Sequence, residues 1–144
     1  GCCGAVKFHL NDQDGGKAQM RANIDAWWPL VERGEVEAIV MNASGCGVTV
    51  KEYGHLLRLE PQYADKAARI SALTRDLSEL LPAMLPELVD KLKDRITVPP
   101  APVAYHPPCT LQHGQKLRGG GSSGAEMVAV SDMPGMLASF RTAR

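Results

Sequence analysis

Residues 36–47 read VEAIVMNASGCG, an apolar run that ends in a cysteine flanked by glycines. The run 36–41 is short and rich in branched apolar side chains, and it follows a helical pattern. We therefore predict a buried strand of a parallel sheet. The glycines at 45 and 47 let the chain turn tightly, and VTVKEYGHLLR (48–58) predicts a helix that begins just beyond Cys46. Cys46 then lies at the carboxyl end of a strand, where open α/β sheets usually keep their sites.

The same order of strand, cysteine and helix is predicted again further along the chain. Residues 103–106 (VAYH) predict a short second strand, Cys109 follows after two prolines, and residues 110–118 predict a helix. If the two strands are parallel, Cys46 and Cys109 emerge at the same edge of one sheet.

Helical periodicity predicts the remaining elements. Apolar residues recur at three- and four-residue steps over 17–33 and 62–81, and a short helix is expected over 87–93. Pro29 is expected to kink or end the first of these helices, and Pro82 and Pro86 to break the second. Residues 97–102 are expected to form an extended connector.

We therefore predict one partial α/β domain over residues 1–118, with a small parallel sheet flanked by helices and lacking its first strand. Residues 119–144 begin with GGGSSG and are predicted to be a linker-like stretch and a tail, with a short helix near 136–140 at most.

Composition and charge exclude several classes of protein. Hydrophobic residues make up 44% of the 144, enough for one globular core, and the apolar stretches are far shorter than the roughly 20 residues that span a bilayer. Sixteen Lys and Arg balance sixteen Asp and Glu, so no overall field favours nucleic acid. The start lacks a methionine and a signal pattern, so we expect Gly1 to be the edge of a fragment. Sparse cysteine favours a reducing compartment.

The four cysteines lie beside glycine or proline in segments typical of turns, which favours metal or cluster ligation over inert packing. Cys2 and Cys3 are adjacent, and a disulfide between neighbours is strained. Iron-sulfur clusters are held by thiolates with backbone N–H groups close to the sulfurs, and a ligand beside a glycine allows that approach. The candidate metal ligands are Cys2, Cys3, Cys46 and Cys109, and the candidate cluster-approach glycines are Gly4, Gly45 and Gly47. Placing Cys46 and Cys109 before helix starts is expected to lower their thiol pKa values.

Other interpretations remain open. Zinc is less favoured because the sequence has no paired C-x-x-C or Cys/His knuckle. His55 and His113 fall in predicted helices, where packing or surface roles are more common, whereas His106 is a candidate donor to a cluster ligand. Cys2 and Cys3 could instead carry out thiol redox chemistry, or the thiols could be spectators in an interaction module that is not an enzyme.

Five stretches together indicate a family. They are GCCGAVKFHLN (1–11), NIDAWWP (23–29), NASGCGVTVKEYGHLL (42–57), YADKA (63–67) and YHPPCTLQHGQKL (105–117). From residue 1 to about residue 120 the sequence resembles the cysteine-rich (CCG) domain of glycolate oxidase iron-sulfur subunits, which is similar to a domain of heterodisulfide reductase. By position, the resemblance assigns Cys2 and Cys3 to the Cys-Cys of a first motif copy, Cys46 to its terminal element and Cys109 to the opening of a second copy. The terminal element in the broader family is C-x-x-C, whereas Ala43 stands at its first position here.

The resemblance implies an electron-transfer subunit that works with flavin-containing partners to oxidise glycolate to glyoxylate, in the cytoplasm or at the inner face of the cytoplasmic membrane. It implies a 4Fe-4S type cluster in the family and flavin in a partner subunit. The chain alone is not expected to be catalytic, because substrate chemistry belongs to the flavin.

Overall fold

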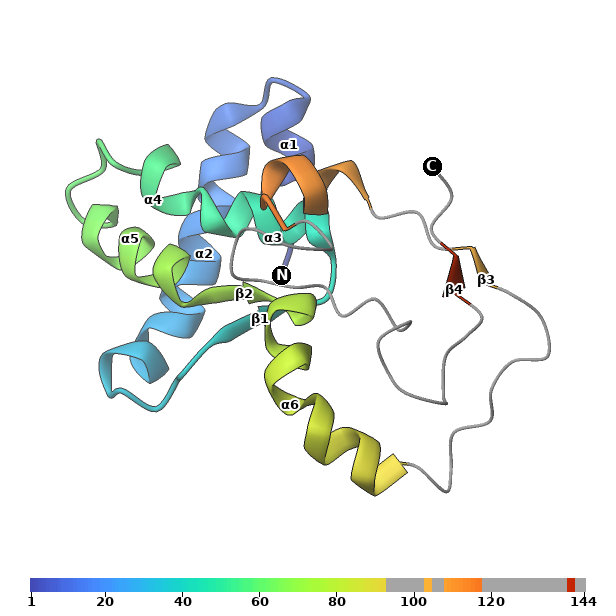
Figure 1. Ribbon diagram of the computed structural model, residues 1–144. Coiled ribbons are helices and arrows are strands. Elements are labelled where there is room, and N and C mark those ends of the chain that lie inside the picture. The colour runs from blue at the N-terminus through green and yellow to red at the C-terminus, as the bar shows by residue number, and fades with distance from the viewer. Residues whose placement is uncertain (93–102, 105–107, 118–139, 142–144) are drawn as a thin grey trace. The chain divides into compact units, whose positions relative to one another are not determined.

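The computed structural model describes residues 1–92, 103–104, 108–117 and 140–141. These residues fall into two compact units, Gly1–Asp76 and Leu77–Arg144 (Figure 1).

The first unit consists of five helices and a pair of short strands. In chain order they are α1 (Ala5–His9), α2 (Gln13–Glu32), β1 (Ile39–Met41), α3 (Ser44–Lys51), α4 (Tyr53–Leu56), α5 (Ala64–Leu73) and β2 (Thr74–Asp76). Strand β1 pairs with β2 in parallel, from Ile39 opposite Thr74 to Met41 opposite Asp76. Helix α3 contacts both strands, and α2, α3 and α4 contact α5. The predicted α/β class with a small parallel sheet is confirmed. The strand predicted over 36–41 is shorter than expected, because β1 spans only Ile39–Met41, and it is not fully buried, because Val40 is exposed.

The strand that pairs with β1 was assigned incorrectly from the sequence. Residues 74–76 were expected inside a helix over 62–81, but the helix ends at Leu73 and Thr74 adopts an extended backbone with ψ 130°. The Thr74 hydroxyl donates to the Ile70 carbonyl at 2.8 Å, which satisfies one of the carbonyls at the helix end. Pairing with β1 then outweighs the helical pattern of the flanking residues.

Helix α2 begins and ends at identifiable signals. Asp12 caps it by accepting from the Gly15 N–H at 2.9 Å, so the helix begins four residues before the predicted start at Lys17. Pro29 was expected to kink or end the helix, but it lies inside a helix that runs on to Glu32, at an exposed position where water can serve the backbone group that loses its partner. Gly34 follows the helix with φ +71°, the left-handed conformation that glycine commonly adopts after a helix end.

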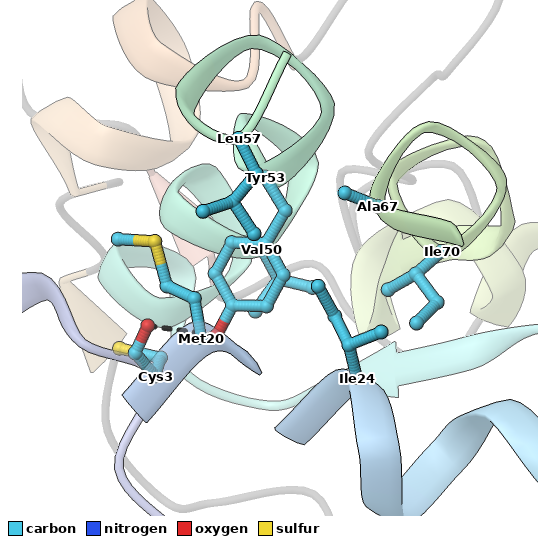
Figure 2. Packing of buried hydrophobic residues seen from close by; sticks show 8 residues of the cluster. All are labelled: Cys3, Met20, Ile24, Val50, Tyr53, Leu57, Ala67 and Ile70. Atoms are coloured by element: carbon cyan, nitrogen blue, oxygen red, sulfur yellow. Dashed lines mark hydrogen bonds between the residues drawn. The ribbon is translucent and has the colours of Figure 1, made fainter. Parts of the chain in front are cut away.

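The core of the first unit lies where α2, α3, α4 and α5 meet (Figure 2). Tyr53 and Leu57 are fully buried at its centre, and the apolar faces predicted for α2 and α5 point into it. The fully buried cluster also contains Met20, Ile24, Val50, Ala67 and Ile70, and Cys3 lies at its edge with 9% of its surface exposed.

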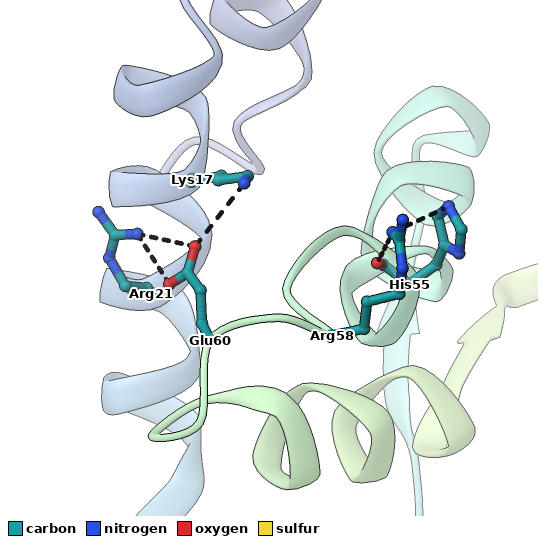
Figure 3. Close-up of polar contacts among 5 residues, drawn as sticks. All are labelled: Lys17, Arg21, His55, Arg58 and Glu60. Carbon is teal, nitrogen blue, oxygen red and sulfur yellow. Dashed lines mark hydrogen bonds and ion pairs between the residues drawn. The ribbon is translucent and has the colours of Figure 1, made fainter.

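A charged cluster ties the segment between α4 and α5 to helix α2 (Figure 3). The Glu60 carboxylate accepts from Arg21 at 2.9 Å and 3.2 Å, and Lys17 lies 3.9 Å from the same carboxylate. On the neighbouring turn, the Arg58 guanidinium donates to the His55 carbonyl at 2.7 Å.

The second unit contains α6 (Leu77–Leu92), β3 (Val103–Ala104), a π-helical turn η1 (Thr110–Gly114) and β4 (Phe140–Arg141). Strand β3 pairs with β4 in parallel, and it matches part of the strand expected over 103–106. The helix expected over 110–118 is only the turn η1. The connector 97–102 and the helix near 136–139 lie outside the described residues, and residue 140 is in β4.

The prediction that Pro82 and Pro86 break the helix was wrong, because both lie within α6, which also includes residues 87–92 of the separate helix predicted over 87–93. Residues four apart lie on the same face of a helix, so the two prolines remove backbone N–H donors on one face only. The helical hydrogen bonds on the other faces remain. In the part of the chain that the structure describes, no helix combines the length and apolar character needed to cross a bilayer.

Candidate metal centre

Two cysteines that are far apart in the sequence lie in contact in the first unit. The Sγ atoms of Cys3 and Cys46 are 3.3 Å apart and share a hydrogen bond, although the two residues are 43 positions apart in the sequence. Cys3 precedes α1 and is buried, whereas Cys46 lies in the first turn of α3 and is half-buried. All four cysteines are free thiols.

The turn after β1 places Cys46. Ala43 has an extended backbone and Ser44 begins α3, so the helix starts two residues before Cys46 and not beyond it as predicted. The Gly47 N–H donates to the Ala43 carbonyl at 2.9 Å, and the Thr49 hydroxyl donates to the Gly45 carbonyl at 3.1 Å. The first turn of the helix is therefore closed around Cys46.

The backbone of the Cys2-Cys3 pair is held by two side chains that the sequence analysis did not single out. The Tyr53 hydroxyl donates to the Cys3 carbonyl at 2.7 Å, and the Asn23 amide donates to the Cys2 carbonyl at 2.8 Å. The same amide donates to the Tyr53 hydroxyl at 3.1 Å. We call Asn23 and Tyr53 the carbonyl clamp. A sequence signal existed, since Asn23 lies beside Ile24 on the buried stripe of a helix, where a polar side chain needs a partner.

Gly4 sets the direction in which the chain leaves the cysteine pair. Its φ is +91°, and a Cβ placed there would lie 2.6 Å from the Gly16 carbonyl oxygen of α2. Only glycine meets both conditions without strain. Gly45 differs, because a Cβ there would have no neighbour within 4 Å.

The prediction that a helix start lowers the Cys46 pKa was wrong. The hydrogen bond with Cys3 raises the pKa of Cys46, burial raises it further, and nearby Cys3 and Cys2 add to the effect because a second negative charge is unfavourable there. Burial likewise raises the pKa of Tyr53 to about 12, against a smaller lowering by the Asn23 hydrogen bond.

The other candidates lie in different places. Cys2 is exposed, and Cys109 is exposed at the start of η1 in the second unit, so the predicted meeting of Cys46 and Cys109 stays a prediction. His55 lies in α4 and His113 in η1, and His106 lies outside the described residues. Over residues 1–92, 103–104, 108–117 and 140–141, no three His, Cys, Asp or Glu side chains gather in a group that could hold a metal ion.

Comparisons with known proteins show which family the sequence resembles. Residues 1–51, which include both sulfurs of the contact, match the CCG cysteine-rich domain family. The chain is 54% identical over 119 residues to the glycolate oxidase iron-sulfur subunit of Escherichia coli, covering 83% of this chain and 28% of that protein. It is 33% identical over 112 residues to a probable glycolate oxidase iron-sulfur subunit of Bacillus subtilis, covering 78% of this chain and 23% of that protein.

A more distant relative is lactate utilization protein A of Bacillus licheniformis, 28% identical over 110 residues, covering 76% of this chain and 42% of that protein. No solved structure matches the chain. The chain spans less than a third of the two glycolate oxidase subunits that it matches. The resemblance predicted from the sequence is therefore confirmed, and residues 1–51 are identified as CCG cysteine-rich domain sequence related to glycolate oxidase iron-sulfur subunits.

Proposed function

We propose that the chain is part of an electron-transfer iron-sulfur subunit, and that Cys3 and Cys46 are the first two ligands of its cluster. The observation that carries the proposal is the 3.3 Å contact between these two sulfurs. A buried cysteine that only fills space needs no second thiol against it, so the contact favours ligation over spectator thiols in an interaction module.

The donor set fits thiolate-held iron. Iron-sulfur clusters are held by cysteine thiolates, and the structure brings two cysteine sulfurs from distant parts of the sequence to within 3.3 Å of each other. Cys2 is next to Cys3 in the sequence, so we propose it as a further ligand. We propose Cys109 as the fourth ligand on the resemblance alone, together with a 4Fe-4S type cluster. His106 remains the candidate donor to a ligand.

The chain's own residues have separate tasks in this proposal. A bound cluster accepts and releases one electron at a time. Cys3 and Cys46 must give up their protons to bind metal. Asn23 and Tyr53 hold the backbone carbonyls beside the thiols, and Gly4 sets the bend that follows them.

By the relatives' names, we propose that the whole protein passes electrons in the oxidation of glycolate, with a flavin in a partner subunit as the site of substrate chemistry. We also propose that this complex works in the cytoplasm, with peripheral association at the inner face of the cytoplasmic membrane.

Anaerobic reconstitution tests the proposal. The purified chain is incubated with ferrous iron, sulfide and reductant, desalted, and assayed for iron, acid-labile sulfide and visible absorption. We expect a brown protein that dithionite bleaches, and loss of most bound iron in Cys3→Ser and in Cys46→Ser. A matched control is His55→Ala, which removes an exposed potential ligand of α4.

The control should bind as much iron and sulfide as the unchanged chain. A colourless, iron-free unchanged chain would contradict the proposal. Equal iron binding by Cys46→Ser would contradict the role of the contact, because iron would then be held elsewhere.

A further inference from the structure

The Cys3 and Cys46 contact also carries a chemistry that needs no metal. We propose that in the metal-free chain these two thiols form a reversible disulfide, which withholds the ligands until it is reduced. The proposal goes beyond electron transfer, because it concerns the chain before any cluster is bound.

The geometry selects this pair of thiols. Their sulfurs are 3.3 Å apart, and a disulfide requires about 2.05 Å, so rotation about the side-chain bonds must close about 1.3 Å. Cys2 competes poorly with Cys46 as a partner for Cys3, because a bridge between neighbours is strained.

The surroundings hold the pair in place. The Tyr53 hydroxyl holds the Cys3 carbonyl at 2.7 Å, and Asn23 holds the preceding carbonyl at 2.8 Å. Cys46 is fixed by the first turn of α3. Both backbones are therefore held in place while the two sulfurs lie 3.3 Å apart.

Exposure assigns the order of events. Cys46 is half-buried and Cys3 is buried, so an incoming oxidant meets Cys46 first. With a low-molecular-weight disulfide such as oxidised glutathione, the Cys46 thiolate attacks one glutathione sulfur, a mixed disulfide forms and one glutathione leaves as thiolate.

The Cys3 thiolate then attacks the Cys46 sulfur, the protein disulfide forms and the second glutathione leaves. Two protein thiols have lost two electrons and two protons, and one glutathione disulfide has become two glutathione thiols. Excess reduced glutathione or dithiothreitol reverses both steps.

The test uses the metal-free, reduced chain under anaerobic conditions with a series of reduced-to-oxidised glutathione ratios. We expect the intact mass to fall by two hydrogen atoms without a glutathione adduct, and dithiothreitol to restore it. Trypsin leaves Cys2 and Cys3 together in peptide 1–7 and Cys46 in peptide 34–51, so the non-reduced digest should contain these two peptides linked.

Single variants identify the sulfurs within those peptides. Cys2→Ser and Cys109→Ser should form the linked pair as the unchanged chain does, whereas Cys3→Ser should lose it. Cys46→Ser should also lose it, and circular dichroism melts establish that each variant is folded.

Two results would overturn the proposal. One is stable glutathione adducts with no internal bond in the unchanged chain, and the other is a link that survives in Cys3→Ser. Iron binding by the fully reduced chain is measured separately, so failure of the disulfide and failure of the iron-sulfur proposal are distinguishable.

Discussion

Replacing Tyr53 by phenylalanine removes one hydroxyl from the centre of the first unit and leaves the ring in place. That hydroxyl donates to the Cys3 carbonyl at 2.7 Å and accepts from Asn23 at 3.1 Å. Asn23 keeps its bond to Cys2, but the Cys3 carbonyl loses this donor. An unsatisfied buried group costs about 1–3 kcal/mol, so the free energy of unfolding should fall by that amount.

The assay is urea and thermal unfolding of the reduced chain, followed by circular dichroism. Tyr63→Phe is the matched control, because it removes an exposed hydroxyl that donates to Asp25 at 3.0 Å. It should change the free energy of unfolding by about 0.5 kcal/mol or less. In a unit of this size each kcal/mol lowers the melting temperature by about 4–8 °C.

High pH gives an independent check on the buried hydroxyl. Folding raises the Tyr53 pKa from 10.0 to about 12, so both states hold the proton below pH 10 and its contribution is complete there. The contribution is lost as pH rises from 10 through about 12, since the unfolded chain ionises first. Tyr53→Phe has no hydroxyl to ionise, so the difference in free energy of unfolding between it and the unchanged chain should become smaller from pH 10 to about pH 12. A variant as stable as the unchanged chain at pH 7 would refute the reasoning about the clamp.

Three further predictions concern the first unit, each read from urea unfolding. Gly4→Ala should lower the free energy of unfolding by at least about 1–2 kcal/mol, because alanine is strained at φ +91° and its Cβ would meet the Gly16 carbonyl. Gly45→Ala should raise the free energy of unfolding by about 0.5–1 kcal/mol, because a Cβ there has no neighbour within 4 Å. Equal effects of the two substitutions would contradict the role given to Gly4. Leu57→Ala, at a fully buried position, should cost about 2–5 kcal/mol, and a loss below about 1 kcal/mol would place Leu57 outside the core. Glu60→Gln should cost about 1 kcal/mol or less at low salt and nearly nothing at high salt, because its ion pairs are partly exposed; a loss independent of salt would contradict an ionic origin.

The sequence predicted the features that depend on local pattern. The buried faces of α2 and α5 follow from helical periodicity. Branched apolar residues indicated the strand β1, but it covers only 39–41 of the predicted 36–41 and leaves Val40 exposed. The strand β2 was missed because residues 74–76 become extended only when β1 lies beside them. The prolines of α6 were wrongly expected to end the helix. Pro82 and Pro86 remove two backbone donors on one face, and the helix continues through its other hydrogen bonds.

The candidate site was predictable in its residue types and not in its environment. Glycines beside Cys3 and Cys46 indicated thiols in turns, and in the structure these two sulfurs lie in contact. The clamp could not be derived from spacing, because Tyr53 reaches the Cys3 carbonyl across 50 residues. The direction of the Cys46 pKa shift was also wrong, because the effect of a neighbouring thiol outweighs a helix terminus.

Iron K-edge X-ray absorption of the anaerobically reconstituted chain, compared with Cys46→Ser, tests most directly whether the two sulfurs in contact hold one inorganic centre. We predict iron surrounded only by sulfur, with iron as the next neighbour, in the unchanged chain, and loss of that signal in the variant. Iron bound mainly by oxygen or nitrogen, or an identical spectrum from Cys46→Ser, would contradict a shared centre.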